Sequence, residues 1–281
     1  GMAPDELRSK SEPSWTPPIG VALVFVLYAF GGWNDSAFVA AEVESPKRNM
    51  PIALIAGIIG ITVLYLITNL AYLAGLGLDG LRRADAPAAD LAASVFGTSG
   101  KAIVSVLVMI SALGAVNGMA LTGSRVYARL GQDHNVFRWL AHWNESRGAP
   151  TRSLVAQAVV SSLMIVLVGS SAGRFALDQT VRCFGIDGVP WFDDAFETLV
   201  AGTAPIFWFF FLLTGIAFFV LRRRDGGTQR PFRVPLYPIT PILFCAMCVY
   251  MLYASADYAK GLIAIGLVPL IAGPLIYWLA D

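Results

Sequence analysis

The sequence predicts an all-α polytopic membrane protein with seven transmembrane helices. Of its 281 residues 56% are hydrophobic and 14% are charged, and the mean hydropathy is +0.64. This composition is too apolar for an ordinary soluble domain. A bilayer core requires about 20 mostly apolar residues per helix, and runs of this kind recur along the chain. The predicted spans are Ile19–Ala41, Ile52–Leu76, Ala102–Ser124, Ser153–Gly169, Phe196–Leu221, Leu236–Ala254 and Gly261–Ala280.

Residues 1–18 are polar and contain prolines, and they lack the apolar stretch and cleavage site that mark a secretory signal. We expect an extracytoplasmic loop or simply a chain end there. Residues 222–235 form a basic connection between two groups of spans, which cover 19–221 and 236–281. The formal net charge of +1 gives no indication of a nucleic-acid surface.

The distribution of cations predicts the orientation in the membrane. Lys and Arg are concentrated after the first, third and fifth spans, and these connections should therefore be cytoplasmic. The N-terminus would then lie outside and the C-terminus inside. An odd number of spans that begins outside fits a piece of a larger protein. The cations concerned are Lys47, Arg48, Arg125, Arg129, Arg138, Arg147, Arg152, Arg222, Arg223, Arg224, Arg230 and Arg233.

The first predicted span contains a motif that is unusual for the middle of a membrane helix. Gly31 and Gly32 are followed by Trp33, Asn34 and Asp35. Glycine tolerates dihedral angles that end a helix, and Asn or Asp can cap the next one. The carbonyl end of the first half-helix would suit an ammonium group, as in transporters with discontinuous helices. A helix that is merely kinked, with its polar residues facing the cytoplasmic interface, explains the motif about as well.

Other polar or small residues in the spans have simpler expected roles. Asn69 and Asn117 are expected to hydrogen-bond across helices, or alternatively to line a pathway. Gly114, Gly118 and Thr122 recur every four residues and predict close packing against a neighbouring helix.

The sequence offers little that would support catalysis or cofactor binding. Cys245 and Cys248 have Cys-x-x-Cys spacing, but no further Cys or His lies nearby in the sequence, so we expect a packing role. No Ser-His, Cys-His or zinc-ligand constellation occurs within the spans. We therefore expect neither an enzyme nor a cofactor. A seven-helix receptor remains the alternative to a transporter, on the number of spans alone.

Three motifs occur in order over nearly the whole chain. They are Phe30-Gly31-Gly32-Trp33-Asn34 with Glu42 to Pro51, Gly114 to Gly118 running into Gly123-Ser124-Arg125, and Leu221 to Arg224 with Arg230 to Pro235. These motifs resemble the amino acid–polyamine–organocation superfamily, and in particular its L-type amino-acid transporters and their bacterial relatives. In chain order they resemble the sixth helix with its following loop, the eighth helix, and the loop between the tenth and eleventh helices.

The resemblance implies a fold, a function and a location. The seven spans would be helices six to twelve of a leucine-transporter-type fold, which comprise the second inverted repeat (19–221) and two peripheral helices (236–281). Helices one to five, with half of the substrate site, would be missing partners. The implied function is amino-acid transport by alternating access, as an antiporter or coupled to protons. The expected location is the bacterial inner membrane.

The resemblance also implies substrate-binding positions. Tyr28 takes the place of an aromatic gate, and the backbone carbonyls of Tyr28, Ala29 and Gly31 would contact the α-ammonium group of an amino acid. Phe207 falls where some animal relatives have an asparagine in the side-chain pocket, so their substrate preferences do not transfer. The predicted substrate-binding residues are Tyr28, Ala29, Phe30, Gly31, Gly32, Trp33 and Asn34.

Overall fold

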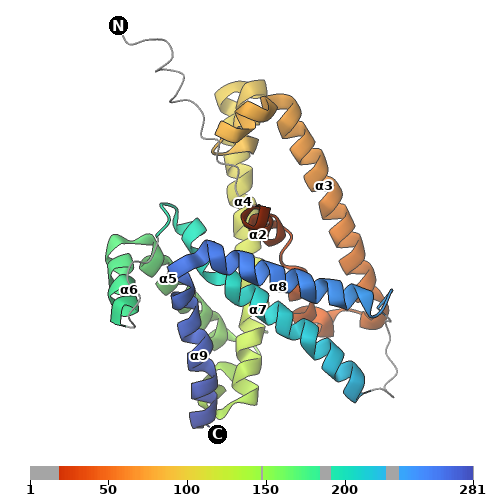
Figure 1. Ribbon diagram of the computed structural model, residues 1–281, viewed down its shortest axis with the longest axis vertical. Helices are drawn as coiled ribbons and strands as arrows, with labels where there is room; N and C mark the ends of the chain where they lie inside the picture. The colour runs from red at the N-terminus through yellow and green to blue at the C-terminus, as the bar shows by residue number, and fades with distance from the viewer. Residues whose placement is uncertain (1–18, 147, 184–190, 226–233, 281) are drawn as a thin grey trace. The chain divides into compact units, whose positions relative to one another are not determined.

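The computed structural model describes residues 19–146, 148–183, 191–225 and 234–280, and all named elements within them are helices (Figure 1). The predicted segment 1–18 and most of the basic connection 222–235 lie outside the described residues. In chain order the elements are α2 Ile19–Ala29, η1 Trp33–Glu42, α3 Pro46–Arg83, α4 Pro87–Asp133, η2 Asn135–Ala141, α5 Thr151–Gly169, α6 Ser171–Cys183, α7 Ala195–Arg224, α8 Ile239–Ala259, η3 Lys260–Leu262 and α9 Ile263–Ala280.

Among the described residues, six stretches are long and apolar enough to cross a membrane, and each overlaps one of the first six predicted spans. The seventh predicted span is occupied by α9, which has 18 residues and is not among the six. The all-helical membrane class is therefore confirmed, whereas the seven-span repeat arrangement stays a prediction.

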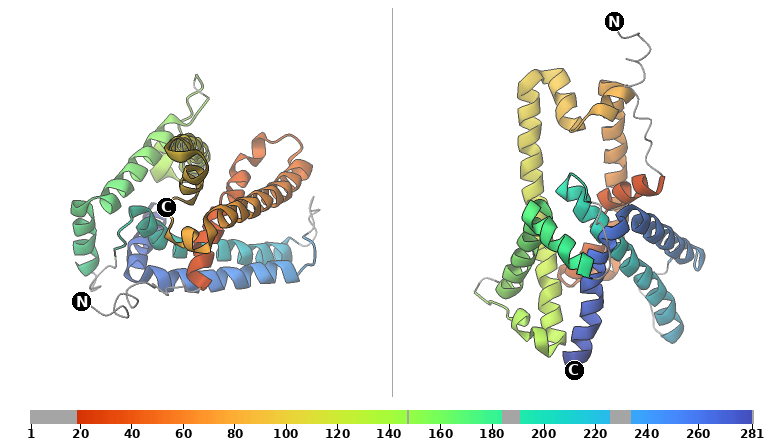
Figure 2. Two further views of the ribbon diagram at one scale, coloured as in Figure 1. Left: turned by 90° about the horizontal axis from the view of Figure 1, so that it is seen from above. Right: turned by 60° about the vertical axis from the view of Figure 1, so that its left-hand side comes forward.

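Helices α3 and α4 are longer than the predicted spans because each includes a glycine kink near the connection between them. Gly77 has φ 67° in α3, and Gly97 has φ 64° in α4. Glycine adopts a positive φ without the steric cost that a Cβ would bring. The chain reverses after the first kink, so that the long parts of α3 and α4 run in opposite directions (Figure 2).

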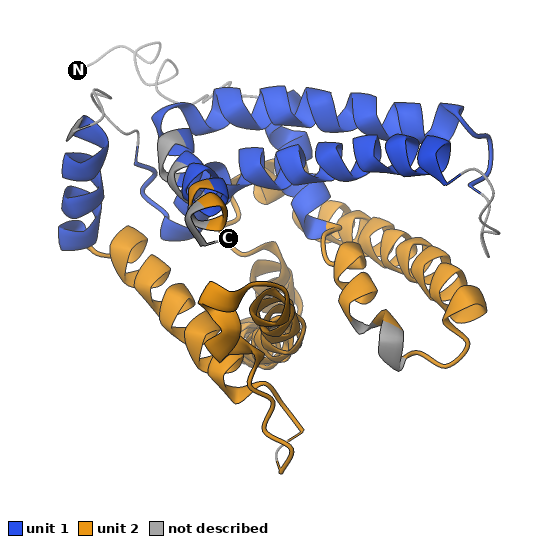
Figure 3. Cartoon of the chain, turned by 90° about the horizontal axis from the view of Figure 1, so that it is seen from below, with its two compact units in different colours: residues 1–29, 171–228, 234–274 blue, residues 30–170, 229–233, 275–281 orange. Residues whose placement is uncertain are grey.

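The chain divides into two compact units, which are coloured separately in Figure 3. The first unit contains residues 1–29, 171–228 and 234–274, and the second contains residues 30–170, 229–233 and 275–281. In the first unit α7 and α8 lie side by side in opposite directions, and α2 packs against α8 (Figures 1 and 3).

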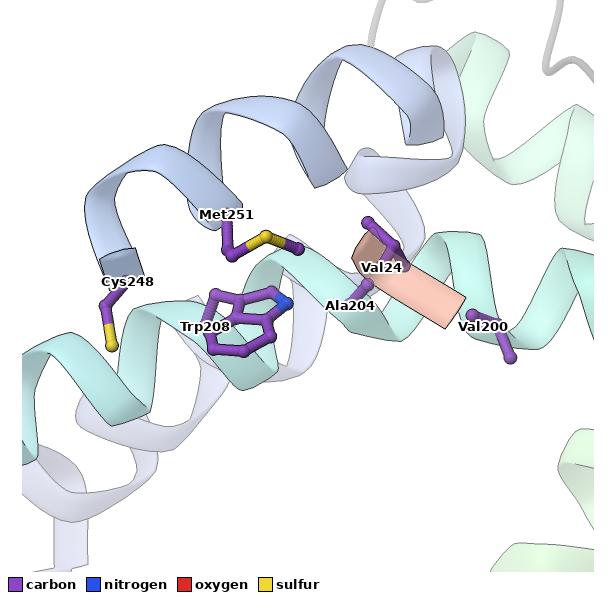
Figure 4. Close-up of a cluster of buried hydrophobic side chains, with 6 residues drawn as sticks. All are labelled: Val24, Val200, Ala204, Trp208, Cys248 and Met251. Atoms are coloured by element: carbon purple, nitrogen blue, oxygen red, sulfur yellow. The ribbon is translucent and has the colours of Figure 1, made fainter. Parts of the chain in front are cut away.

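The core of the first unit forms where α2, α7 and α8 meet. Val24 of α2 is fully buried between residues of the other two helices, and Met251 of α8 is also fully buried (Figure 4). Cys248 is 1% exposed in this cluster, which confirms its predicted packing role. The cluster consists of Val24, Val200, Ala204, Trp208, Cys248 and Met251.

A glycine sets the distance between α2 and α8. An ideal Cβ added to Gly20 would lie 2.8 Å from the Cβ of Ala254, closer than real Cβ contacts. Gly20 therefore allows the two helices to approach each other, and this approach brings Val24 into the core.

The second unit is held together around the end of α4. The hydroxyl of Ser153, which is fully buried, donates to the carbonyl of Leu140 at 2.8 Å and ties α5 to η2. Gln157 Nε2 donates to the carbonyl of Met119 at 3.2 Å and links α5 to α4.

Within the described part of this chain, the predicted contacts of Asn69 and of the small-residue stripe are not formed, and both roles stay predictions. Asn69 donates to the carbonyl of Tyr65 at 2.8 Å, so it bonds to its own helix rather than across helices. No described residue outside the helix's own backbone lies within 4 Å of a Cβ added to Gly114 or Gly118. The close contact is made instead by Gly123, where an added Cβ would lie 2.7 Å from Gln157 Nε2.

The long helices of the second unit leave their apolar side chains exposed. Helix α3 has no buried residue, and Ile59, Leu66 and Leu70 of α3 are about 60% exposed. A soluble monomer rarely exposes an apolar surface of this size, whereas a membrane helix meets lipid or further helices there. The exposure therefore agrees with membrane insertion.

Replacing Gly20 by leucine is expected to destabilise the first unit by about 1–3 kcal/mol, because the added side chain forces α2 away from α8. Gly57→Leu is the matched control, since Gly57 has open space around it in α3. Thermal unfolding of the purified protein in detergent should show a lower Tm for Gly20→Leu than for Gly57→Leu. Equal midpoints would contradict the packing described.

Candidate functional site

The first membrane-crossing stretch is interrupted at the predicted position. Helix α2 ends at Ala29, and the 3-10 helix η1 begins at Trp33. Gly32 lies at the N-cap of η1 with φ 92° and ψ −14°, in the left-handed region. The N–H of Asp35 donates to the carbonyl of Gly32 at 3.1 Å and closes the first turn of η1. Within the motif from Phe30 to Asp35, Gly32 is the residue that has a positive φ, a conformation that favours glycine.

The expectation that Asn34 or Asp35 caps the second half-helix was wrong. The N-cap of η1 is Gly32, and no side-chain hydrogen bond is made there. Instead Asn34 Nδ2 donates to Asp35 Oδ1 at 2.8 Å. Asn34 Oδ1 is buried and finds no hydrogen-bond partner among the described residues. The two side chains pair with each other because the turn begins before them, at a residue that has no side chain.

Tyr28, in the last turn of α2, contacts helix α7. Its ring lies 5.3 Å from the ring of Phe207, measured between centroids, in a tilted arrangement. Its hydroxyl lies 3.3 Å from Thr203 Oγ1. Tyr28, the predicted gate, therefore lies next to Phe207, the predicted pocket position, within the first unit.

Thr203 is a residue of this site that the sequence analysis missed. It lies four residues before Phe207, so the two share a face of α7. The signal available in the sequence was one hydroxyl on the face of an apolar helix that carries Phe207. That signal is weak, since a threonine in a membrane helix commonly bonds to its own backbone, as Thr203 does to the carbonyl of Leu199 at 2.7 Å.

The remaining predicted residues lie in two different surroundings. Ala29 is exposed at the end of α2. The ring of Phe30 packs edge-on against Tyr65 of α3, with 5.1 Å between centroids. Trp33 is 42% exposed at the start of η1. Phe30 to Asn34 belong to the second unit, while Tyr28 and Ala29 belong to the first.

The electrostatics at Tyr28 come from the backbone. Helix α2 contains no charged residue. The last four carbonyls of an α-helix lack partners within the helix, so the C-terminal end carries partial negative charge. This end of α2 can accept hydrogen bonds from an ammonium group. Among the described residues no group of three or more His, Cys, Asp or Glu is placed to hold a metal ion.

The second unit contains a separate cavity of about 400 Å³ beside the end of α4. Its cationic residues include Arg129, whose Nε pairs with Asp133 Oδ2 at 3.1 Å. Because this guanidinium already has a carboxylate partner, the cavity by itself indicates no anionic ligand. The lining residues are Phe38, Arg125, Val126, Ala128, Arg129, Gln132 and Trp143.

Comparison with known proteins identifies the family. A sequence model described as amino acid permease matches residues 4–278. The chain is 24% identical to the b(0,+)-type amino acid transporter 1 of Rattus norvegicus, over 88% of this chain and 45% of the relative. It is 25% identical to the serine/threonine exchanger SteT of Bacillus subtilis, over 83% of this chain and 48% of the relative.

A third relative covers more of the chain. The large neutral amino acids transporter small subunit 2 of Mus musculus is 27% identical over 98% of this chain and 47% of the relative. The chain thus spans about half the length of the curated relatives it matches. Together the family match, the three sequence motifs and the interrupted first membrane helix lead to one conclusion: the chain belongs to the amino acid permease family.

Proposed function

We propose that this chain transports amino acids across a membrane as the second-repeat part of a permease. The observation that carries the proposal is the break at Gly32, which places the carbonyl end of α2 inside a predicted span. Membership of the amino acid permease family supports the substrate class. The receptor alternative is not carried forward, because the family and the relatives named above are transporters.

The proposed substrate site is built around the break. The carbonyls of Tyr28, Ala29 and Gly31 would accept hydrogen bonds from the α-ammonium group of the substrate. Phe30, Gly32, Trp33 and Asn34 would shape the break, and the ring of Tyr28 would cover the substrate. Helices equivalent to one to five of the fold would hold the carboxylate and complete the site.

The proposed mechanism is alternating access. One group of helices would rock against another around a site at the middle of the membrane, with Gly32 as the hinge. Exchange of one amino acid for another and coupling to protons are both compatible with this site. Named exchangers among the relatives, such as the Bacillus subtilis serine/threonine exchanger, support exchange.

The break is tested by uptake of a radiolabelled amino-acid mixture in proteoliposomes. The protein would be this chain joined to an upstream five-helix segment from its own genomic neighbourhood, compared with this chain alone. We expect saturable flux from the joined protein. Gly32→Ala should lower it roughly fivefold to thirtyfold, because a left-handed conformation costs a residue with a Cβ about 1–2 kcal/mol.

Gly57→Ala is the control for this experiment. An added Cβ meets no described residue within 4 Å at either Gly32 or Gly57, but only Gly32 of the two has a positive φ. Unchanged flux in Gly32→Ala would remove the hinge from the proposal. Absence of flux from the joined protein with every amino acid would overturn the proposed substrate class.

The proposed orientation places the N-terminus outside and the C-terminus inside a bacterial inner membrane. Single cysteines can be introduced at Glu145 and Ser171, both exposed, in a background without the three native cysteines. A membrane-impermeant maleimide added to intact cells should label Ser171→Cys and leave Glu145→Cys unlabelled until the cells are lysed. The reverse pattern would invert the proposed topology.

A further inference from the structure

We propose that Thr203 sets the direction of the Tyr28 hydroxyl hydrogen bond, so that the site selects uncharged amino acids whose side chains donate a hydrogen bond. This inference rests on the proposed function and names the substrate class of the same site. It comes from the contacts between α2 and α7 within the first unit.

The hydroxyl protons of Thr203 and Tyr28 can be assigned from the contacts of Thr203. A threonine hydroxyl has one proton and two acceptor lone pairs. Thr203 Oγ1 lies 2.7 Å from the carbonyl of Leu199, which can only accept, so the Thr203 proton is committed to that bond. The oxygen of Thr203 must therefore accept in its 3.3 Å contact with the Tyr28 hydroxyl, and Tyr28 must donate.

This assignment of protons determines which hydrogen bond the Tyr28 hydroxyl can form with a ligand. With its proton directed to Thr203, the phenol oxygen of Tyr28 presents a lone pair, and it can only accept from a further partner. The contact between the two hydroxyls is exposed within the described part of this chain, and in the proposed site it would face the substrate. A side chain that approaches Tyr28 then gains a hydrogen bond only when it brings an O–H or N–H.

The surroundings of Tyr28 on α2 and α7 are uncharged and aromatic. No residue of α2 is charged, and neither is any residue of α7 between Thr198 and Leu221. The ring of Phe207 lies against Tyr28, and Phe211 follows it with 4.4 Å between the two phenyl centroids. A charged side chain would be desolvated against these rings without a counter-charge on these parts of the two helices. The surroundings favour an uncharged donor, such as a hydroxyl.

Threonine and valine are a matched pair of substrates for the test, since they have nearly the same shape and differ in one hydroxyl. In the joined permease in proteoliposomes, the ratio of kcat/KM for threonine over valine should be roughly threefold to tenfold, as expected for one net hydrogen bond. Tyr28→Phe removes the acceptor and should bring this ratio to about one.

Thr203 is the positioning residue, and its variants separate its role from simple packing. Thr203→Val keeps the shape but lets the Tyr28 proton turn toward the ligand, so the preference for threonine should fall. Thr203→Ser restores the acceptor and should restore the ratio, although it removes a methyl group. Thermal unfolding of all variants reports any packing effect independently.

The outcomes separate a failure of the proposed transport function from a failure of the inference about Thr203 and Tyr28. If the joined permease carries no amino acid, the proposed function itself fails. If it carries amino acids but the threonine-to-valine ratio is unchanged in Tyr28→Phe, or if Thr203→Ser behaves like Thr203→Val, the proposed function stands and this inference is overturned.

Discussion

Helix α2 is too short to cross a bilayer, and the geometry of the candidate site depends on the backbone that follows this helix. Its 11 residues extend about 16 Å, whereas the hydrocarbon core is about 30 Å thick. The chain continues through Gly32 into η1, and the stretch that is long and apolar enough to cross a membrane runs from Ile19 to Phe38. Non-helical backbone at that depth is tolerated only where protein or a water-filled cavity surrounds it. A break in this helix therefore implies that protein or a water-filled cavity surrounds it, and the second of these is what the proposed substrate site requires.

Packing within the first unit fixes the position of α2, the helix that precedes the break. Gly20 lets α2 approach α8, and Val24 then fills the core between α7 and α8. One turn further along α2, Tyr28 reaches Thr203 and Phe207 on α7. Tyr28, the proposed gate, is thus held by helices that pack through apolar contacts, and its hydroxyl contacts Thr203.

Hydropathy was sufficient to locate the first six predicted spans, because a run of apolar residues long enough to cross a bilayer has few alternatives. The Gly31-Gly32 pair was sufficient to place the break. Sequence could not determine which glycine takes the left-handed conformation, or that η1 is a 3-10 helix, since both depend on the bonds made by Asp35 and its neighbours. The predicted cap failed because the N-cap of η1 is Gly32, which has no side chain, and Asn34 and Asp35 pair with each other instead.

Contacts between distant segments were harder to predict. Thr203 lies 175 residues from Tyr28 in the chain, and their meeting depends on how α2 crosses α7. The small-residue stripe at Gly114 and Gly118 predicted a neighbour that the described part of this chain does not supply, although the spacing itself is clear. A stripe of small residues indicates that a helix can approach closely but does not identify the partner.

The central claim is that an amino acid binds at the end of α2, and protection of that end from chemical modification tests it most directly. Ala29, which is exposed there, would be replaced by cysteine in the joined permease without its native cysteines. The account predicts that a transported amino acid slows alkylation of Ala29→Cys saturably and leaves alkylation of Glu145→Cys, an exposed position between predicted spans, unchanged. Alkylation of Ala29→Cys at the same rate with and without saturating substrate, in a permease that still transports, would contradict it.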